Sequence, residues 1–167
     1  MINGAGGSAG TFAIQMARMA GLKIACVDNA RKQDAMRKLG AHETFDYAKA
    51  DFATMGLPYN RIVDFVATRP PRKVAKALIK GGQYWALGGR LRTILRIFIG
   101  GRFIRGKSVQ VLGAKMDRDA LAAVMPLIES GVVQPQIDRV YPLAEAPQAL
   151  RRLGDGKSFG KIVVRCD

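Results

Sequence analysis

The sequence is poor in residues that bind metals or form disulfides. One histidine, His42, and two cysteines, Cys26 and Cys166, occur in 167 residues. The two thiols lack the paired spacing of a metal site, and a single histidine cannot build a Ser-His-Asp or Cys-His site. We therefore expect no bound metal, no such catalytic triad, and free thiols in a reducing compartment.

Long apolar runs are also missing. No run approaches the roughly 20 apolar residues that span a bilayer, and the N-terminus lacks the charged-then-apolar plan of a signal peptide. We therefore expect a cytoplasmic protein. The 167 residues fit one domain, which is large enough to bury a core without disulfide bonds.

Acidic residues are scarce. Asp and Glu total 13 against 27 Lys and Arg, which gives a formal net charge of +14. Such a charge can attract nucleic acid, a membrane surface or an acidic partner. Because the bases are spread along the chain, we favour a solvated basic surface. A face that attracts a phosphorylated cofactor comes next, and specific binding of nucleic acid is the least favoured alternative.

What the sequence does contain is a glycine-rich turn at 3–11, between the end of a strand and the start of a helix. It fits two registers of the dinucleotide-binding fingerprint, Gly4-x-Gly6-x-x-Ala9 and Ala5-x-Gly7-x-x-Gly10. Free amides and the positive end of the helix dipole could bind a pyrophosphate there. These amides belong to Gly7, Ser8, Ala9 and Gly10. A tight turn without a ligand is the alternative.

After this turn, strand and helix patterns alternate along the chain. Strands are predicted at 23–28, 42–47, 61–66, 83–87, 108–112 and 161–164, and a further one begins at 140. Helices are predicted at 8–20, 31–39, 71–79 and 117–130, and a further one begins near 143. The alternation predicts an α/β fold, a Rossmann-type doubly wound parallel sheet with helices on both faces.

Two of the predicted helices carry informative residues. In helix 8–20, small and apolar residues at helical spacing predict the buried face, and Gln15 and Arg18 fall on the opposite face. In helix 117–130, Pro126 removes an amide, so it should bend or divide the helix.

Polar residues follow the second and third predicted strands, where ligands bind in open parallel sheets. Asp28 ends the second strand and could accept hydrogen bonds from an adenosine ribose, which favours NAD. Asn29, Arg31, Lys32 and Tyr47 could instead surround a ribose 2′-phosphate, which favours NADP. The sequence leaves both cofactors open, and Asp28 could also simply cap the helix that follows.

Residues 90–105 interleave basic side chains with bulky apolar ones. Their position directly after the fifth strand predicts a helical excursion that packs on a second domain, a twin subunit or the mouth of a substrate site. Contact with a membrane is a less favoured alternative.

Five blocks of sequence occur in an order typical of one superfamily. They are NGAGGSAG at 3–10, LGA at 39–41 with DY at 46–47, GGQYWALG at 81–88, YPLAEAPQAL at 141–150 and GKIVV at 160–164. On these blocks, the whole chain resembles the cofactor-binding half of the medium-chain dehydrogenase/reductase superfamily. It looks most like the zinc-free quinone oxidoreductase-like branch and the NAD(P)-dependent alcohol dehydrogenases.

The resemblance implies further cofactor contacts at the ends of strands. Thr68, Gly88, Gly89, Arg90 and Gly113 match family positions that approach the ribose and the nicotinamide. No catalytic residue can be assigned. In the zinc-containing relatives the metal ligands belong to the other domain.

The resemblance also implies a function. We expect 1–167 to be the NAD(P)-binding domain of an oxidoreductase that transfers hydride between a nicotinamide cofactor and a carbonyl, alcohol or quinone. Since Met1-Ile2-Asn3 supplies only the end of a first strand, we expect a shortened strand, an absent N-terminal GroES-like catalytic domain and weak or no activity alone. A homo-oligomer or a partner chain is expected, and nucleic acid and membranes are not favoured partners. An interaction or anion-binding module that retains the fold is the alternative.

Overall fold

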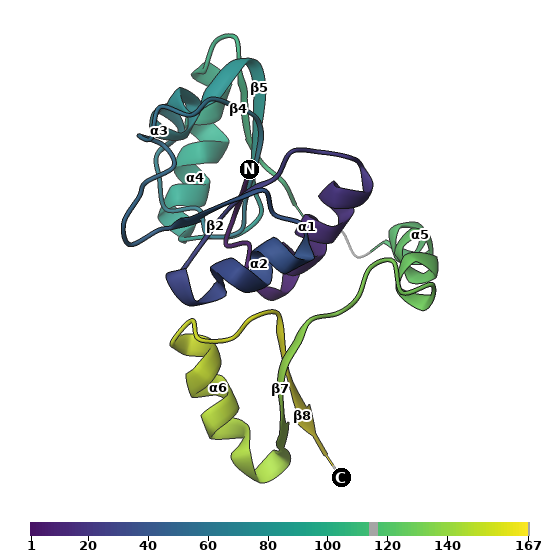
Figure 1. Cartoon of the computed structure of the whole chain (residues 1–167). Coiled ribbons are helices and arrows are strands. Elements are labelled where there is room, and N and C mark those ends of the chain that lie inside the picture. The colour runs from purple at the N-terminus through teal and green to yellow at the C-terminus, as the bar shows by residue number, and fades with distance from the viewer. Residues whose placement is uncertain (114–116, 167) are drawn as a thin grey trace.

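A six-stranded parallel sheet forms the body of the molecule (Figure 1). The structure, a computed structural model, describes residues 1–113 and 117–166. The strand order is β3-β2-β1-β4-β5-β6. The bounds are β1 (Ile2–Asn3), β2 (Ala25–Asp28), β3 (Glu43–Asp46), β4 (Tyr59–Asp64), β5 (Leu78–Ala86) and β6 (Ser108–Val111). This order, which reverses direction between β1 and β4, is that of a doubly wound dinucleotide-binding fold and confirms the predicted class.

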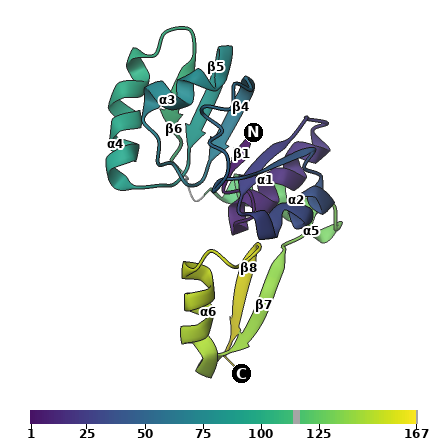
Figure 2. The ribbon, with the colours of Figure 1, turned by 60° about the vertical axis from the view of Figure 1, so that its left-hand side comes forward.

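Helices cover both faces of this sheet, as Figures 1 and 2 show. These helices are α1 (Ser8–Met19), α2 (Gln33–Leu39), α3 (Pro71–Lys76) and α4 (Leu91–Gly100), with 3₁₀ turns η1 (Ala30–Lys32) and η2 (Gly101–Phe103). A further helix, α5 (Arg118–Glu129), lies to one side of the sheet and has no buried residue. Helices α1 and α2 pack together on β1 and β3, whereas α3 and α4 pack together on β5 and β6. Each pair closes its own apolar core, one around Ile14 and Met36 and the other around Val74, Tyr84 and Ile97.

The buried face of α1 differs from the prediction. Thr11, Ile14 and Gln15 are buried, whereas Met16 and Met19 are exposed. Gln15 can be buried because the backbone of Gln134 accepts from its amide nitrogen at 2.9 Å and donates to its amide oxygen at 2.8 Å. The predicted outward position of Gln15 was therefore wrong: a fully paired amide can replace an apolar side chain at a packed surface.

The proline in α5 does not divide the helix. Residues Arg118–Glu129 form one helix, which begins at an Asp117 carboxylate that accepts from the Asp119 amide at 3.0 Å. Pro126 deprives the carbonyl of Ala122 of its intrahelical partner. Because Ala122 is exposed, water can supply that partner, so the helix continues.

The C-terminal part of the chain forms a second, smaller unit beside the main sheet (Figure 1). It consists of β7 (Ile137–Pro142), the 3₁₀ turn η3 (Leu143–Glu145), α6 (Ala146–Gly154) and β8 (Lys161–Arg165). Strands β7 and β8 pair in parallel with each other. Asp138 ties this unit together, since its carboxylate accepts two bonds from the Arg152 guanidinium, at 2.5 and 3.0 Å, and one from the Phe159 amide.

Backbone hydrogen bonds join the small unit to the glycine-rich turn of the body. The amide of Gly160 donates to the carbonyl of Gly6 at 3.0 Å, and Asn29 donates through its side chain to the carbonyl of Gly156 at 3.0 Å. The C-terminal unit is thus docked on the same edge of the sheet that carries the predicted site. Among the described helices, none is long and apolar enough to cross a membrane.

Candidate functional site

All the loops that follow the strands of the main sheet open at one edge, because all six strands are parallel. The structure therefore gathers the predicted site residues at this carboxyl edge. They are Gly7, Ser8, Ala9 and Gly10 after β1, Asp28, Asn29 and Lys32 after β2, Tyr47 after β3, Thr68 after β4, Gly88, Gly89 and Arg90 after β5, and Gly113 after β6. The switch point between β1 and β4 lies at its centre, where ligands bind in such sheets.

Glycine is required at different positions of the first turn for different structural reasons. Gly4 has a φ of +77°, and a Cβ there would lie 2.6 Å from Val66, so it makes the tight turn. Gly10 brings α1 against the turn, because a Cβ would lie 2.4 Å from the Gly4 carbonyl oxygen and 2.5 Å from that of Ala5. These roles fall at positions 4 and 10, so each of the two sequence registers contains only one of them.

Gly7 is the glycine that no such contact demands. It caps α1 with ordinary extended angles, φ −82° and ψ 173°, and a Cβ would approach only the Gly4 carbonyl oxygen, at 3.3 Å. No side chain caps the helix here. The amides of Ser8, Ala9 and Gly10, in the first turn of α1, have no intrahelical acceptor. Gly160 of the C-terminal unit pairs with Gly7 through an isolated parallel bridge, so that unit lies against the turn. A helix N-terminus with a glycine cap is a fitting place for an anion.

Asp28 lies beneath this turn and is already extensively paired. Its carboxylate accepts from the Gly6 amide at 2.8 Å and the Asn29 amide at 2.9 Å, and it forms an ion pair with the Lys32 ammonium at 3.0 Å. Both charged side chains are only 9% exposed. Gly6 is glycine because Lys32 crosses it: a Cβ would lie 2.4 Å from the lysine Cδ. A carboxylate has about four acceptor positions, so Asp28 retains one for a ligand.

Asn29 presents an unpaired polar atom at the same edge. Its Oδ1 is buried and has no hydrogen-bond partner among the described residues, although its amide nitrogen is bound to Gly156. A buried acceptor without a donor is costly and rare in native proteins. This oxygen is available to accept a hydrogen bond from a water or a ligand hydroxyl.

The remaining predicted contacts on the Asp28 side and after β4 and β6 are open to solvent. Tyr47 is 58% exposed, and its amide donates to the Asp28 carbonyl at 3.1 Å, which holds the ends of β2 and β3 side by side. Thr68 and Gly113 are exposed. These three residues lie along the carboxyl edge, where they are accessible to a ligand.

The turn after β5 is fixed by close backbone contact with the turn after β4. Gly89 has a φ of +143°, and a Cβ there would lie 2.2 Å from the Ala67 carbonyl oxygen. The Ala67 amide donates to the Gly88 carbonyl at 2.8 Å, and the Arg90 amide donates to the Ala67 carbonyl at 3.3 Å. This close packing is sufficient reason for a glycine at position 89, whether or not a ligand binds. The exposed Arg90 is the N-cap residue of α4.

A buried acid under the switch point was not singled out in the sequence. Asp64, the last residue of β4, is fully buried and accepts from Asn3 Nδ2 at 2.7 Å, Tyr84 Oη at 2.8 Å and the Val66 amide at 2.9 Å. Burial, and then Asp64 itself, raise the pKa of Tyr84. The network ties β1, β4 and β5 together below the edge. An Asp at the end of an apolar strand was the only signal.

The histidine and the buried cysteine have structural surroundings. His42 Nδ1 accepts from the Ile24 amide at 3.1 Å, at the amino end of β3 and away from the carboxyl edge. Burial raises the pKa of the Cys26 thiol to about 12. Within 1–113 and 117–166, no group of three or more His, Cys, Asp or Glu side chains could hold a metal ion. The residues described thus do not fit a zinc site.

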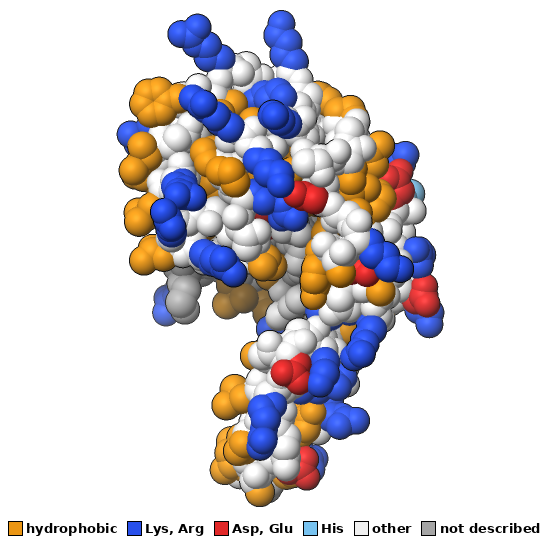
Figure 3. Space-filling view, turned by 90° about the vertical axis from the view of Figure 1, so that its left-hand side faces the viewer, with side chains coloured by type: hydrophobic (Ala, Val, Ile, Leu, Met, Phe, Trp, Pro, Cys, Tyr) orange, Lys and Arg blue, Asp and Glu red, His pale blue; other side chains and the backbone are white. Residues whose placement is uncertain are grey.

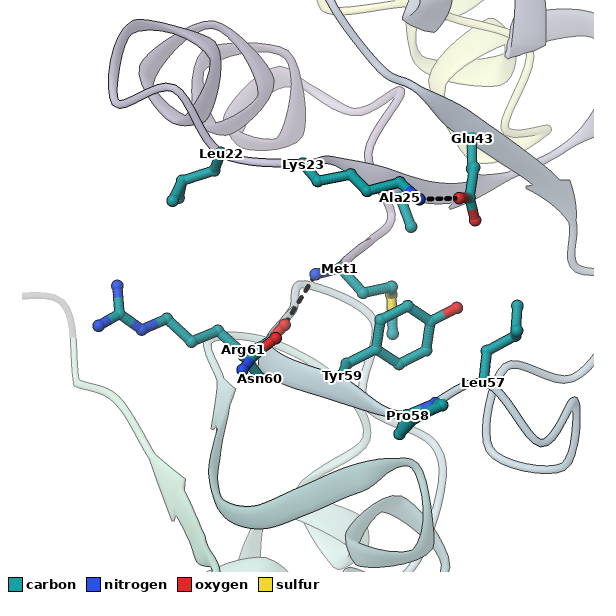
Figure 4. A pocket seen from close by; sticks show the side chains of 10 residues that line it. All are labelled: Met1, Leu22, Lys23, Ala25, Glu43, Leu57, Pro58, Tyr59, Asn60 and Arg61. Atoms are coloured by element: carbon teal, nitrogen blue, oxygen red, sulfur yellow. Dashed lines mark hydrogen bonds and ion pairs between the residues drawn. The ribbon is translucent and has the colours of Figure 1, made fainter.

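A hollow of about 570 Å³ lies at the opposite, amino edge of the sheet (Figure 4). Its walls carry a Lys23 to Glu43 ion pair at 3.0 Å and the Met1 amino group, which donates to the Arg61 carbonyl at 2.7 Å. The Tyr59 hydroxyl is buried nearby without a partner in the described chain. Because dinucleotides bind at the carboxyl edges of such sheets, we do not assign this hollow to the cofactor.

Comparison with protein families gives one assignment. The profile of a family described as zinc-binding dehydrogenase matches residues 39–164. The match begins at the end of α2 and runs into β8, so it includes the turns after β4, β5 and β6 as well as the C-terminal unit.

Known proteins match the chain over nearly its full length. A zinc-type alcohol dehydrogenase-like protein of Schizosaccharomyces pombe is 25% identical, over all of this chain and 51% of its own. A chloroplastic NADPH-dependent alkenal/one oxidoreductase of Arabidopsis thaliana is 29% identical, over 98% of this chain and 39% of its own. A quinone oxidoreductase structure from Coxiella burnetii superposes with a TM-score of 0.84, at 21% identity, over 99% of this chain and 52% of that one. The chain spans about half the length, or less, of these proteins.

Proposed function

The chain belongs to the zinc-binding dehydrogenase family, in the medium-chain dehydrogenase/reductase superfamily, and we propose that 1–167 form its nicotinamide-dinucleotide-binding domain. The reaction in which this domain would take part is hydride transfer between the nicotinamide and a carbonyl, alcohol or quinone. The observation that carries the proposal is the glycine-capped N-terminus of α1 at the switch point of the sheet.

Three features of the carboxyl edge support a dinucleotide there. The first-turn amides of α1 offer donors to a pyrophosphate, and the helix dipole adds a favourable field. Gly7 places no side chain at these amides, and the paired backbone of Gly160 lies beside it. Asp28 and Asn29 each keep an acceptor, one carboxylate position and one buried amide oxygen, for ribose hydroxyls.

The cofactor supplies the hydride chemistry when bound, and the protein positions it. In this proposal the α1 N-terminus holds the pyrophosphate, the Asp28 end of β2 holds the adenosine ribose, and the turns at 67–68 and 88–90 border the nicotinamide half. The Asp64 network keeps β1, β4 and β5 in place beneath these contacts.

We expect NADH to bind more tightly than NADPH. A 2′-phosphate would approach the Asp28 carboxylate, and Lys32, which the sequence offered as a partner for that phosphate, is already paired with this carboxylate. Arg31 is exposed and is the cation that would have to offset the repulsion. An acid at the end of β2 is suited to an unphosphorylated ribose. Parallel titrations should favour NADH by about tenfold, which corresponds to about 1.4 kcal/mol; equal or tighter binding of NADPH would contradict this preference.

The chain alone should bind the cofactor but turn over slowly. Among the described residues no group of three or more His, Cys, Asp or Glu side chains could hold a metal ion, and Asp28 and Lys32 at the carboxyl edge are paired with each other. The test is steady-state oxidation of NADH with benzoquinone and with aliphatic aldehydes, measured next to cofactor binding. Binding with negligible turnover supports the proposal, whereas turnover at about 1 s⁻¹ or faster, within the ordinary range of enzymes, would show that the chain is catalytically complete.

A further inference from the structure

The outer face of α4 is apolar, which is unusual for a helix on the surface of a domain. Thr93 and Ile97 are buried against the sheet. Leu91, Leu95 and Ile99, spaced by four residues, point away from it and are 75%, 52% and 62% exposed. The neighbouring Phe98 and Phe103 are 56% and 78% exposed. We call these five side chains the α4 ridge.

Basic side chains surround the α4 ridge. Exposed arginines flank it, namely Arg72, Arg92, Arg96, Arg102 and Arg105. The Arg102 guanidinium lies 5.1 Å from the centre of the Phe98 ring. Figure 3 shows this face, where Lys and Arg side chains alternate with hydrophobic ones over the upper part of the molecule. None of these five arginines forms an ion pair with the residues that the structure describes.

The segment of chain that carries the ridge has charges of one sign. Between Asp64 and Asp117 the sequence contains no Asp or Glu, and every charged residue is Lys or Arg. Two copies that met ridge to ridge would therefore place unpaired positive charges opposite one another, which is destabilising. The apolar side chains of the ridge also cannot bind a phosphate backbone, so nucleic acid would contact only the arginines that flank the ridge.

We propose that the α4 ridge docks on a bilayer surface that carries anionic phospholipids. A helix with bulky apolar residues on its outer face and arginines beside them lies in the interface, with its apolar face in the headgroup region and its bases on the lipid phosphates. A groove of about 640 Å³ between α3 and α4, lined by Pro70, Pro71, Leu95 and Ile99 among others, adds apolar surface beside the ridge. The sequence alone made membrane contact a less favoured interpretation than packing on a second domain or a twin subunit. The observation that favours anionic lipid is that the arginines beside the ridge form no ion pair with the described residues.

The bound orientation is compatible with the candidate site. Helix α4 begins at Leu91, just after its N-cap Arg90 on the carboxyl edge, and packs on one face of the sheet. Docking through its outer face therefore leaves the N-terminus of α1 uncovered, because α1 packs on the other side of the sheet.

The test is sedimentation of the full chain with large unilamellar vesicles of phosphatidylcholine containing 30% phosphatidylglycerol. The variant Leu95→Glu/Ile99→Glu should lower the partition coefficient by at least about tenfold, since it removes two inserted side chains and adds two anions. The matched control is Leu150→Glu/Leu153→Glu, which makes the same charge change at two exposed leucines of α6, 69% and 55% exposed. It should bind within about twofold of the wild-type chain.

Circular dichroism and thermal unfolding should show both variants folded, since all four positions are exposed. Equal loss of binding in the two variants would overturn the proposal, because net charge alone would then explain attachment. Failure of the wild-type chain to bind these vesicles at low salt would overturn it as well, and would direct the ridge to an acidic protein partner. A calorimetric titration with NADH, run on Leu95→Glu/Ile99→Glu, should be unchanged, which keeps this result separate from the cofactor proposal.

Discussion

Removal of the Tyr84 hydroxyl should destabilise the fold measurably. Tyr84 Oη donates to the buried Asp64 carboxyl group at 2.8 Å, and the other Asp64 oxygen is held by Asn3 and the Val66 amide. Tyr84→Phe keeps the ring and leaves one buried oxygen of Asp64 without a donor. A hydrogen bond to a charged group contributes about 1.5–3 kcal/mol, so we expect a loss of about 2 kcal/mol in the free energy of unfolding. For a chain of this size that lowers the melting temperature by about 4–8 °C.

The same substitution at Tyr59 is the matched control. The Tyr59 hydroxyl is buried but has no partner among the described residues, and burial raises its pKa. Tyr59→Phe removes a desolvated hydroxyl that gains nothing, so stability should stay within about 0.5 kcal/mol or increase. Urea unfolding of both variants, with unchanged m-values, measures the difference. Equal losses in the two variants would refute the role assigned to the Asp64 network.

Other substitutions separate packing, capping and charge. Gly10→Ala places a Cβ 2.4 Å from a carbonyl oxygen and should cost about 2 kcal/mol or more in a urea unfolding experiment. Gly7→Asp should cost much less, because its Cβ would approach a carbonyl oxygen only to 3.3 Å and the N-cap angles suit Asp. A hydrogen bond from Arg152 lowers the pKa of Asp138, so its stabilisation is complete above the ordinary value of 3.8 and is lost as the pH falls through the lower folded value. At pH 7 the melting temperature of Asp138→Asn should therefore be lower than that of the wild-type chain. The difference between the two melting temperatures should be smaller at pH 3, and an equal difference at both pH values would contradict the pairing.

The fold class was accessible from the sequence because strands and helices alternate and each buried strand is short and apolar. Strand β2 is buried at all four positions, as a strand covered on both faces must be. The face of α1 was not accessible. Gln15 is buried only because Gln134, more than a hundred residues away, supplies its hydrogen-bond partners, and no local pattern contains that information.

The candidate site was also only partly visible in the sequence. Glycines and strand ends marked the carboxyl edge, because these features depend on local backbone. The roles of the glycines required coordinates: Gly6 accommodates Lys32, Gly10 packs on the turn, and Gly7 caps α1 beside the backbone of Gly160. The separate β7 and β8 sheet could not be distinguished from a continuation of the main sheet, since its strands have the same apolar pattern.

The most direct test of the central claim is a calorimetric titration of the chain with NADH, repeated on Gly7→Asp. The aspartate fits the N-cap backbone and places a carboxylate at the amides that would hold the pyrophosphate. The account predicts a dissociation constant for the wild-type chain within the common range of about 1 µM to 1 mM. It predicts at least about tenfold weaker binding for the variant, with the variant still folded by circular dichroism at the temperature of the titration. Equal binding by the two proteins, or no binding by the wild-type chain, would contradict it.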